Sequence, residues 1–309
     1  VNSIKDLCYS SGLINCSFGK EKGGEEKELC LDVYLPDRDE KETAKIPIMI
    51  LIHGGGFACG SKEVMEPFAT EFASRGYAAI AVGYRLTPEE PFVSEKWRKF
   101  VLDAAGGDEE GVIQGVATVT QLWSAWAAAR DCKAALRFIF SVAGDHNLDL
   151  DNVSIHGGSA GGLVGVALAG ADMGSAFDPV TCQKSCKLDQ TYKIHRLLLF
   201  CSGTMLSQFA AKYTKTNTLE GIPPALFICG TKDDTFPPEM AEAAKKLWAD
   251  AKTPFKYVEY DGGHCQAFGE RGNGELTACI EFLEKNGNIQ LQENDPPPPT
   301  SPKKSCVIV

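Results

Sequence analysis

This sequence of 309 residues lacks the features that mark several large classes of protein. No run of about 18 apolar residues occurs, so no transmembrane helix is predicted. The formal net charge is −10 and no basic stripe is present, which argues against nucleic acid or an anionic membrane surface as a partner. Internal repeats are absent as well. With 44% hydrophobic residues, the chain has the composition of a globular protein with a sizeable core.

Cysteine is too dilute for a disulfide scaffold, although twelve cysteines are more than a cytosolic enzyme usually needs. We expect Cys201 and Cys229, which stand inside apolar runs, to pack as free thiols. Five others lie in loop-like or terminal stretches where disulfides could form: Cys8, Cys16, Cys30, Cys182 and Cys186. The pair Cys182 and Cys186 lacks a second pair or a histidine cluster, so no metal site is predicted.

Short apolar runs alternate with longer amphipathic stretches, a pattern that predicts a mostly parallel central sheet flanked by helices. Strands are expected at 28–35, 46–52, 78–82, 153–156, 197–201, 225–229 and 255–260, the first of them at the sheet edge. Helices are expected at 68–74, 131–139, 160–169, 238–251 and 275–283. We predict a single α/β domain over residues 1–290, because α/β folds of this size commonly form one unit.

Two segments depart from this alternation. Residues 87–124 lie between a predicted strand and the helix that covers it, and they are more numerous than a simple connection requires. The segment is interrupted at Gly106-Gly107. We interpret it as an inserted lid or cap over a binding site, with a plain surface excursion as the alternative. Residues 291–309 are expected to form a flexible tail, because four consecutive prolines cannot pack as a regular element.

A serine lies in a glycine-rich turn between a predicted strand and a predicted helix. The segment Gly157-Gly158-Ser159-Ala160-Gly161 satisfies the pattern G-x-S-x-G. Small neighbours allow a sharp turn at Ser159, and the following helix directs the positive end of its dipole toward the serine. In this strand–turn–helix context, the pattern predicts that Ser159 is a catalytic nucleophile.

A second glycine-rich segment, His53-Gly54-Gly55-Gly56-Phe57, follows an apolar run. Glycine lets backbone N–H groups face a substrate oxygen without an intruding side chain. We therefore predict an oxyanion hole formed by the N–H groups of Gly55, Gly56 and Ala160. His53 itself is expected to hold the loop through a hydrogen bond. A tight turn without a function is the alternative for this segment.

A nucleophilic serine needs a base, and the base needs an acid that orients it. His264 lies in a glycine-containing loop after a predicted strand, whereas His156 is expected to pack just before the serine turn. Two acids follow the predicted strand 225–229, at the edge where open α/β sheets form their sites. We favour Asp233 over Asp234 as the orienting acid.

The chain resembles the α/β-hydrolase superfamily, and within it the carboxylesterases related to hormone-sensitive lipase. Five segments carry the resemblance: HGGGF at 53–57, GYRL at 83–86, GGSAGG at 157–162, GTKDD at 230–234 and GGH at 262–264. The resemblance implies an α/β-hydrolase fold with Ser159 as nucleophile, His264 as base and Asp233 as orienting acid, and no cofactor. The stretch after Leu86 is longer than is usual in the family, and the usual N-terminal cap helices are not evident.

The resulting hypothesis is a serine carboxylic ester hydrolase that works through an acyl-enzyme on small short-chain or aromatic esters. An amide hydrolase of the aryl formamidase type is the catalytic alternative. A non-catalytic small-molecule receptor on the same fold is the alternative from another class, and the retained His264 argues against it. Trp97, Trp123 and Trp126 either favour aromatic groups in the substrate or form the core of the lid.

Two cellular locations stay open. The last four residues, 306–309, match a prenylation box at Cys306, which would anchor a cytosolic enzyme to a membrane. Asn15 and Asn152 each begin a glycosylation pattern, which would be used in a secreted protein. Because a secreted protein does not meet the prenyltransferase, the two signals exclude each other, and we favour secretion. The chain begins at Val1 and not at methionine, so we expect a processed or trimmed product.

Overall fold

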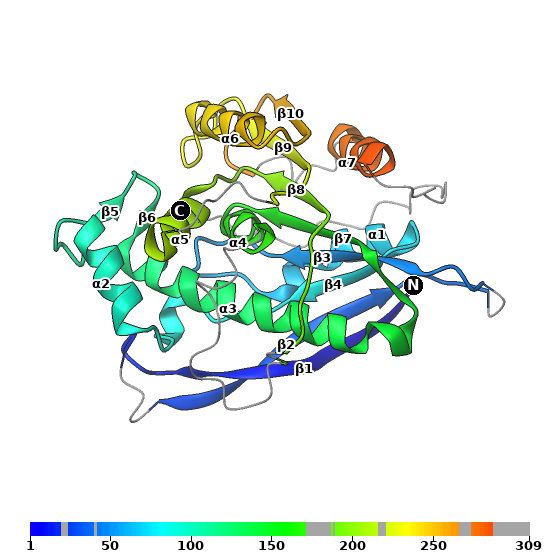
Figure 1. Ribbon diagram of the computed structural model, residues 1–309, viewed down its shortest axis with the longest axis horizontal. Coiled ribbons are helices and arrows are strands. Elements are labelled where there is room, and N and C mark those ends of the chain that lie inside the picture. The colour runs from blue at the N-terminus through cyan, green and yellow to red at the C-terminus, as the bar shows by residue number, and fades with distance from the viewer. Residues whose placement is uncertain are drawn as a thin grey trace.

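A computed structural model describes residues 1–19, 24–39, 42–170, 187, 189–215, 221–265 and 273–286 (Figure 1). Eight strands form one sheet in the order β1-β2-β4-β3-β7-β8-β9-β10. Their bounds are β1 Asn2–Ile14, β2 Glu25–Leu35, β3 Ile46–Ile52, β4 Ala78–Val82, β7 Leu148–Gly158, β8 Arg196–Phe200, β9 Ala225–Gly230 and β10 Phe255–Tyr260. The predicted mostly parallel sheet with flanking helices is therefore confirmed.

The strands from β4 to β10 along the sheet all run parallel. Strand β2 runs antiparallel to both of its neighbours, β1 and β4. The expectation of an edge strand at 28–35 is wrong, because β1 pairs along the outer side of β2. Strand β1 escaped prediction since its buried positions include Ser10 and Ser11, so it carries no apolar alternation. Parallel strands end at one common edge of the sheet, and the loops that leave this edge meet there.

Helices cover both faces of the sheet, which explains why its central strands are apolar throughout. In β3, Ile48, Ile50 and Ile52 pack into one layer, and Met49 and Leu51 pack into the opposite layer. The first layer contains residues of α3 Val119–Val142, α4 Ala160–Ala169, α5 Met205–Thr214 and α6 Pro238–Asp250. The second contains residues of α1 Glu66–Ser74 and α7 Asn273–Asn286.

Helix α3 is much longer than the predicted helix at 131–139. It begins at the N-cap Thr118, whose hydroxyl accepts a hydrogen bond from the N–H of Gln121, while the Gln121 side chain accepts one from the N–H of Thr118. Every residue from 122 to 137 is buried, including charged ones. A helix that is buried on all sides shows no amphipathic period, which is why its N-terminal half escaped prediction.

The predicted lid, residues 87–124, contains a short 3-10 turn at Thr87–Glu89, helix α2 Glu95–Ala104 and the hairpin of β5 Val112–Ile113 and β6 Ala117–Thr118. In Figure 1, α2 and the hairpin lie at the left, on the side toward which the parallel strands point. All three tryptophans, Trp97, Trp123 and Trp126, are buried in the core, and the indole N–H groups of Trp97 and Trp123 donate across α2 and α3 to the carbonyls of Leu122 and Arg98. This burial fits the alternative that they form a core and not a surface for aromatic substrate groups. The lid role itself stays a prediction.

Several sequence predictions lie outside the described residues: Cys182, Cys186, Cys306 and the tail at 291–309. Within the described part, Cys201 and Cys229 are buried free thiols, as expected, and Cys8, Cys16 and Cys30 carry thiols and form no disulfide there. No helix in the described ranges combines the length and the apolar character that a membrane crossing needs.

Candidate active site

Ser159 lies at the turn from β7 into α4, in a backbone conformation that non-glycine residues rarely adopt. Its φ is 50° and its ψ is −121°, which is strained for an L-amino acid. Two hydrogen bonds hold the turn in this conformation. The Ser159 N–H donates to the carbonyl of Phe200 at 2.8 Å, and the Ser202 hydroxyl donates to the Ser159 carbonyl at 2.8 Å. Strain that is stabilised by its surroundings in this way is typical of functional positions.

The glycines around Ser159 are required by close packing. A Cβ on Gly161 would lie 2.1 Å from the carbonyl oxygen of Ile52, at the end of β3. A Cβ on Gly157 would lie 2.6 Å from the backbone of Gly161. The helix α4 can therefore start directly against the neighbouring strand, which places the serine and the N-terminus of the helix at the carboxyl edge of the sheet.

His264 follows β10, and its imidazole lies between Ser159 and Asp233. Its Nε2 is 3.0 Å from Ser159 Oγ, and its Nδ1 is 2.9 Å from Asp233 Oδ2 and 3.1 Å from Oδ1. The ring also stacks on Phe236, with centroids 5.7 Å apart. The structure thus brings together the three side chains that the sequence analysis selected, in the hydrogen-bonded order that a serine nucleophile, a base and an orienting acid need.

Asp233 reaches this position because the loops after β9 and β10 are joined by backbone hydrogen bonds. The N–H of Thr231 donates to the carbonyl of Tyr260 at 2.9 Å, and the N–H of Lys232 donates to that of Gly262 at 2.9 Å. Asp233 is buried at the site, whereas Asp234, the alternative acid, is exposed and does not contact His264 among the contacts of the described residues.

The contact between Asp233 and His264 shifts the pKa of both side chains. Burial opposes the charge of Asp233, but hydrogen bonds from His264 and from the N–H groups of Phe236 and Thr235 outweigh it and lower the pKa of this carboxyl. Burial alone would lower the pKa of His264, but the hydrogen bond and the negative charge of Asp233 outweigh it, so the pKa of His264 is raised. The pair therefore favours an imidazole whose Nδ1 carries a proton toward the carboxylate.

The first glycine loop lies beside the serine. A Cβ on Gly54 would be 3.3 Å from the Cβ of Ser159, and Gly55 and Gly56 have φ values of 108° and 60°. Within the described ranges, the N–H groups of Gly55 and Gly56 donate to no backbone carbonyl. The N–H of Ala160 belongs to the first turn of α4, where helical N–H groups have no partner within the helix. The loop that carries Gly55 and Gly56 thus approaches Ser159 at Gly54, and Ala160 directly follows Ser159.

His53 and His156 have packing roles, as the sequence analysis expected. His53 is buried, its Nδ1 is 2.7 Å from the carbonyl of Gly54, and its ring stacks on Tyr84 at 4.1 Å. Burial lowers the pKa of His53 to about 4 and that of His156 to about 3, so both rings are neutral near pH 7. The ring of His156 packs against Phe200, with centroids 4.7 Å apart.

Two further groups were not predicted from the sequence as functional parts of the protein. A buried ion pair links Arg85 to Asp131 of α3, with Nε to Oδ2 at 2.8 Å and Nη2 to Oδ1 at 2.6 Å. Two thiols, Cys201 and Cys265, adjoin His264, and a hydrogen bond from Cys265 lowers the pKa of Cys201. The only signal for the thiols in the sequence is that Cys265 directly follows His264.

Two protein families have sequence patterns that match this chain, each over a different part of it. The sequence pattern of the prolyl oligopeptidase family matches residues 123–290, which include Ser159, Asp233 and His264. The pattern of a family described as BD-FAE matches residues 31–96, which include the first glycine loop.

Matches to individual curated proteins are short. A non-reducing polyketide synthase of Stereocaulon alpinum is 39% identical over 66 residues, which cover 21% of this chain and 3% of the synthase. A protein named Probable carboxylesterase 1 from Arabidopsis thaliana is 38% identical over 71 residues, covering 21% of this chain and 22% of that protein. The chain therefore spans less than a quarter of the length of either relative.

Solved structures match over most of the chain. Esterase 2 of Thermogutta terrifontis, in a form phosphonylated by cyclosarin, superimposes with a TM-score of 0.60 at 21% identity, covering 84% of this chain and 90% of that one. At this identity the likeness shows a shared fold. Together with the strand order and the family match, it confirms the predicted α/β-hydrolase fold.

Proposed function

Because the chain belongs to the prolyl oligopeptidase family, we propose that it is a serine hydrolase that cleaves carboxylic esters through an acyl-enzyme. One observation carries this proposal: Ser159 Oγ, His264 and Asp233 form a continuous hydrogen-bonded line beside a strained serine turn. The esterase fold of the solved relative and the carboxylesterase name of the plant relative point in the same direction.

In the proposed reaction, Ser159 Oγ attacks the ester carbonyl while His264 Nε2 accepts the serine proton. Asp233 holds the Nδ1–H of His264 and stabilises the positive charge that the imidazole gains. His264 then donates the proton to the departing alcohol, which leaves an acyl group on Ser159. A water molecule attacks this acyl group with His264 again as base, and the acid is released.

The developing negative charge on the carbonyl oxygen needs donors that are already in place. In our proposal the N–H groups of Gly55, Gly56 and Ala160 supply them. The glycine loop approaches Ser159 at Gly54, Ala160 directly follows Ser159, and within the described residues none of the three N–H groups donates to a backbone carbonyl outside the helix. Loss of one such donor typically costs about 3 kcal/mol of transition-state stabilisation.

We further propose small neutral esters as the substrates, with short acyl chains or aromatic groups. A panel of p-nitrophenyl esters of increasing acyl length, together with an aryl formamide of matched size, tests both the reaction and its preference. We expect turnover of the short esters, and loss of turnover in Ser159→Ala. The matched control is Ser154→Ala, a buried serine of the same strand β7, which should keep the rate.

Two outcomes of this panel would favour the alternatives. Faster turnover of the formamide than of every ester would indicate an amide hydrolase of the aryl formamidase type. Absence of turnover on every substrate, with tight binding of one of them, would indicate a non-catalytic receptor on the same fold.

A further inference from the structure

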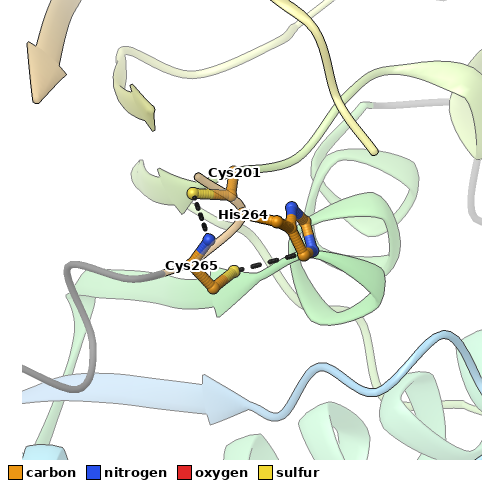
Figure 2. A group of neighbouring side chains, drawn as sticks. All are labelled: Cys201, His264 and Cys265. Atoms are coloured by element: carbon orange, nitrogen blue, oxygen red, sulfur yellow. Dashed lines mark hydrogen bonds between the residues drawn. The ribbon is translucent and has the colours of Figure 1, made fainter. Parts of the chain in front are cut away.

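Two thiols lie beside the histidine of the candidate site, both on the same side of it in Figure 2, and the proposed reaction uses neither of them. Cys201 directly follows β8, and Cys265 directly follows His264 in the loop after β10. Sulfur and imidazole nitrogen are the ligands that Zn²⁺ prefers in proteins. The two thiols and His264 therefore present the donor set of a Cys₂His zinc site.

The spacing of the donor atoms fits one metal ion. The Sγ atoms of Cys201 and Cys265 and a ring nitrogen of His264 all lie within 4.8 Å of one another. Cys265 Sγ is 3.8 Å from His264 Nε2. On a tetrahedral zinc ion, with bonds of about 2.3 Å to sulfur and about 2.0 Å to nitrogen, these two atoms would be about 3.5 Å apart. Only small side-chain movements are needed.

The surrounding backbone holds the sulfur atoms in place. The N–H of Cys265 donates to Cys201 Sγ at 3.1 Å, which is the kind of contact that stabilises a metal-bound thiolate. The N–H of Cys201 donates to the carbonyl of Ile228 in β9 at 2.8 Å, and the Tyr260 hydroxyl lies 2.9 Å from Cys201 Sγ. Cys201 is buried, whereas His264 and Cys265 are partly exposed, so an ion can enter from their side.

We propose that Cys201, His264 and Cys265 bind Zn²⁺ reversibly and that the bound ion switches off the esterase. The inhibitory part of this proposal rests on the proposed function. On binding, the two thiols lose their protons to solvent, and the lone pair of His264 Nε2 bonds to the metal. That lone pair is the one that otherwise accepts the proton of Ser159 Oγ, 3.0 Å away. The nucleophile therefore loses its base while the ion is present.

The experiment measures p-nitrophenyl ester hydrolysis at buffered free Zn²⁺ concentrations, with a phosphine reductant, and again after a chelator is added. For each protein, the hydrolysis rate with Zn²⁺ is divided by the rate of the same protein in chelator. We expect the wild type to lose more than tenfold in rate and to recover fully with chelator. Cys265→Ser and Cys201→Ser should need at least tenfold more Zn²⁺ for the same loss. Cys59→Ser, which removes an exposed thiol beside the first glycine loop, should respond like the wild type.

A second readout detects the ion without activity. Co²⁺ added to Ser159→Ala should give the near-ultraviolet charge-transfer band of a thiolate-bound metal, and the same variant with Cys265→Ser should lose most of it. Equal Zn²⁺ sensitivity of wild type and Cys265→Ser would overturn the proposal, as would a cobalt spectrum without the band. If no protein hydrolyses esters even in chelator, the proposed function fails, and the cobalt spectra alone decide the metal site.

Discussion

At the scale of single residues, the site depends on how Asp233 changes the pKa and the tautomer of His264. The imidazole is partly buried, which by itself would lower its pKa and weaken it as a base at Nε2. The carboxylate 2.9 Å from Nδ1 reverses this effect and also selects the tautomer that leaves Nε2 free to accept a proton. The neighbouring Asp234 is exposed and provides the natural comparison.

The pH dependence of hydrolysis follows from this contact. Because the pKa of His264 is raised above its ordinary value of 6.5, the neutral base is lost as pH falls through a midpoint above 6.5. In Asp233→Asn the acidic midpoint of kcat/KM should move below that of the wild type, because burial lowers the pKa of His264 and the carboxylate that outweighs it is gone. The rate near neutral pH should fall about 10⁴-fold through the wrong tautomer.

Asp234→Asn is the control for this measurement. Asp234 is exposed and acts on His264 through its charge, so its loss should lower the acidic midpoint far less than the loss of Asp233. A wild-type midpoint clearly below 6.5 would contradict the account. Equal profiles for Asp233→Asn and Asp234→Asn would contradict the choice of Asp233 as the orienting acid.

At the scale of secondary-structure elements, a buried ion pair ties the strand β4 to helix α3. Arg85, just after β4, makes a two-point contact with Asp131, and its third donor reaches the carbonyl of Leu13 in β1. Both charged side chains are almost fully buried. A charge that loses its partner in such surroundings costs far more than one on the surface.

Stability measurements test this link. Asp131→Leu leaves the guanidinium unpaired and should lower the free energy of unfolding by about 3–5 kcal/mol in urea titrations. The double variant with Arg85→Met should recover part of this lost stability, because neither charge of this buried pair then remains. Asp103→Asn, which breaks the exposed pair of Lys99 and Asp103, should change stability little. A double variant less stable than Asp131→Leu would contradict this explanation.

The sequence predicted those elements whose burial leaves a local pattern. Strand β3 is apolar on both faces because helices cover both, and the serine turn has a recognisable glycine pattern. Strand β1 and the first half of α3 left no such pattern, because β1 buries serines and α3 is buried all round. The contact of Cys201 with His264 depends on strands β8, β9 and β10 lying side by side, which no local pattern encodes.

At the scale of the whole molecule, the site is assembled from distant parts of the chain by the parallel sheet. The glycine loop follows β3, Ser159 follows β7, Asp233 follows β9 and His264 follows β10. Because these strands are parallel, their carboxyl ends share one edge, and the four loops meet there. The central claim is that this meeting point makes Ser159 a nucleophile.

Covalent labelling with a fluorophosphonate tests that claim most directly, because the reagent reacts with an activated serine and needs no knowledge of the substrate. Intact mass and peptide mapping would follow the label while ester hydrolysis is measured in parallel. We expect one phosphonyl group per chain, located on Ser159, with activity lost in proportion to labelling and no label in Ser159→Ala. Label on another residue, or full hydrolysis by fully labelled protein, would contradict it.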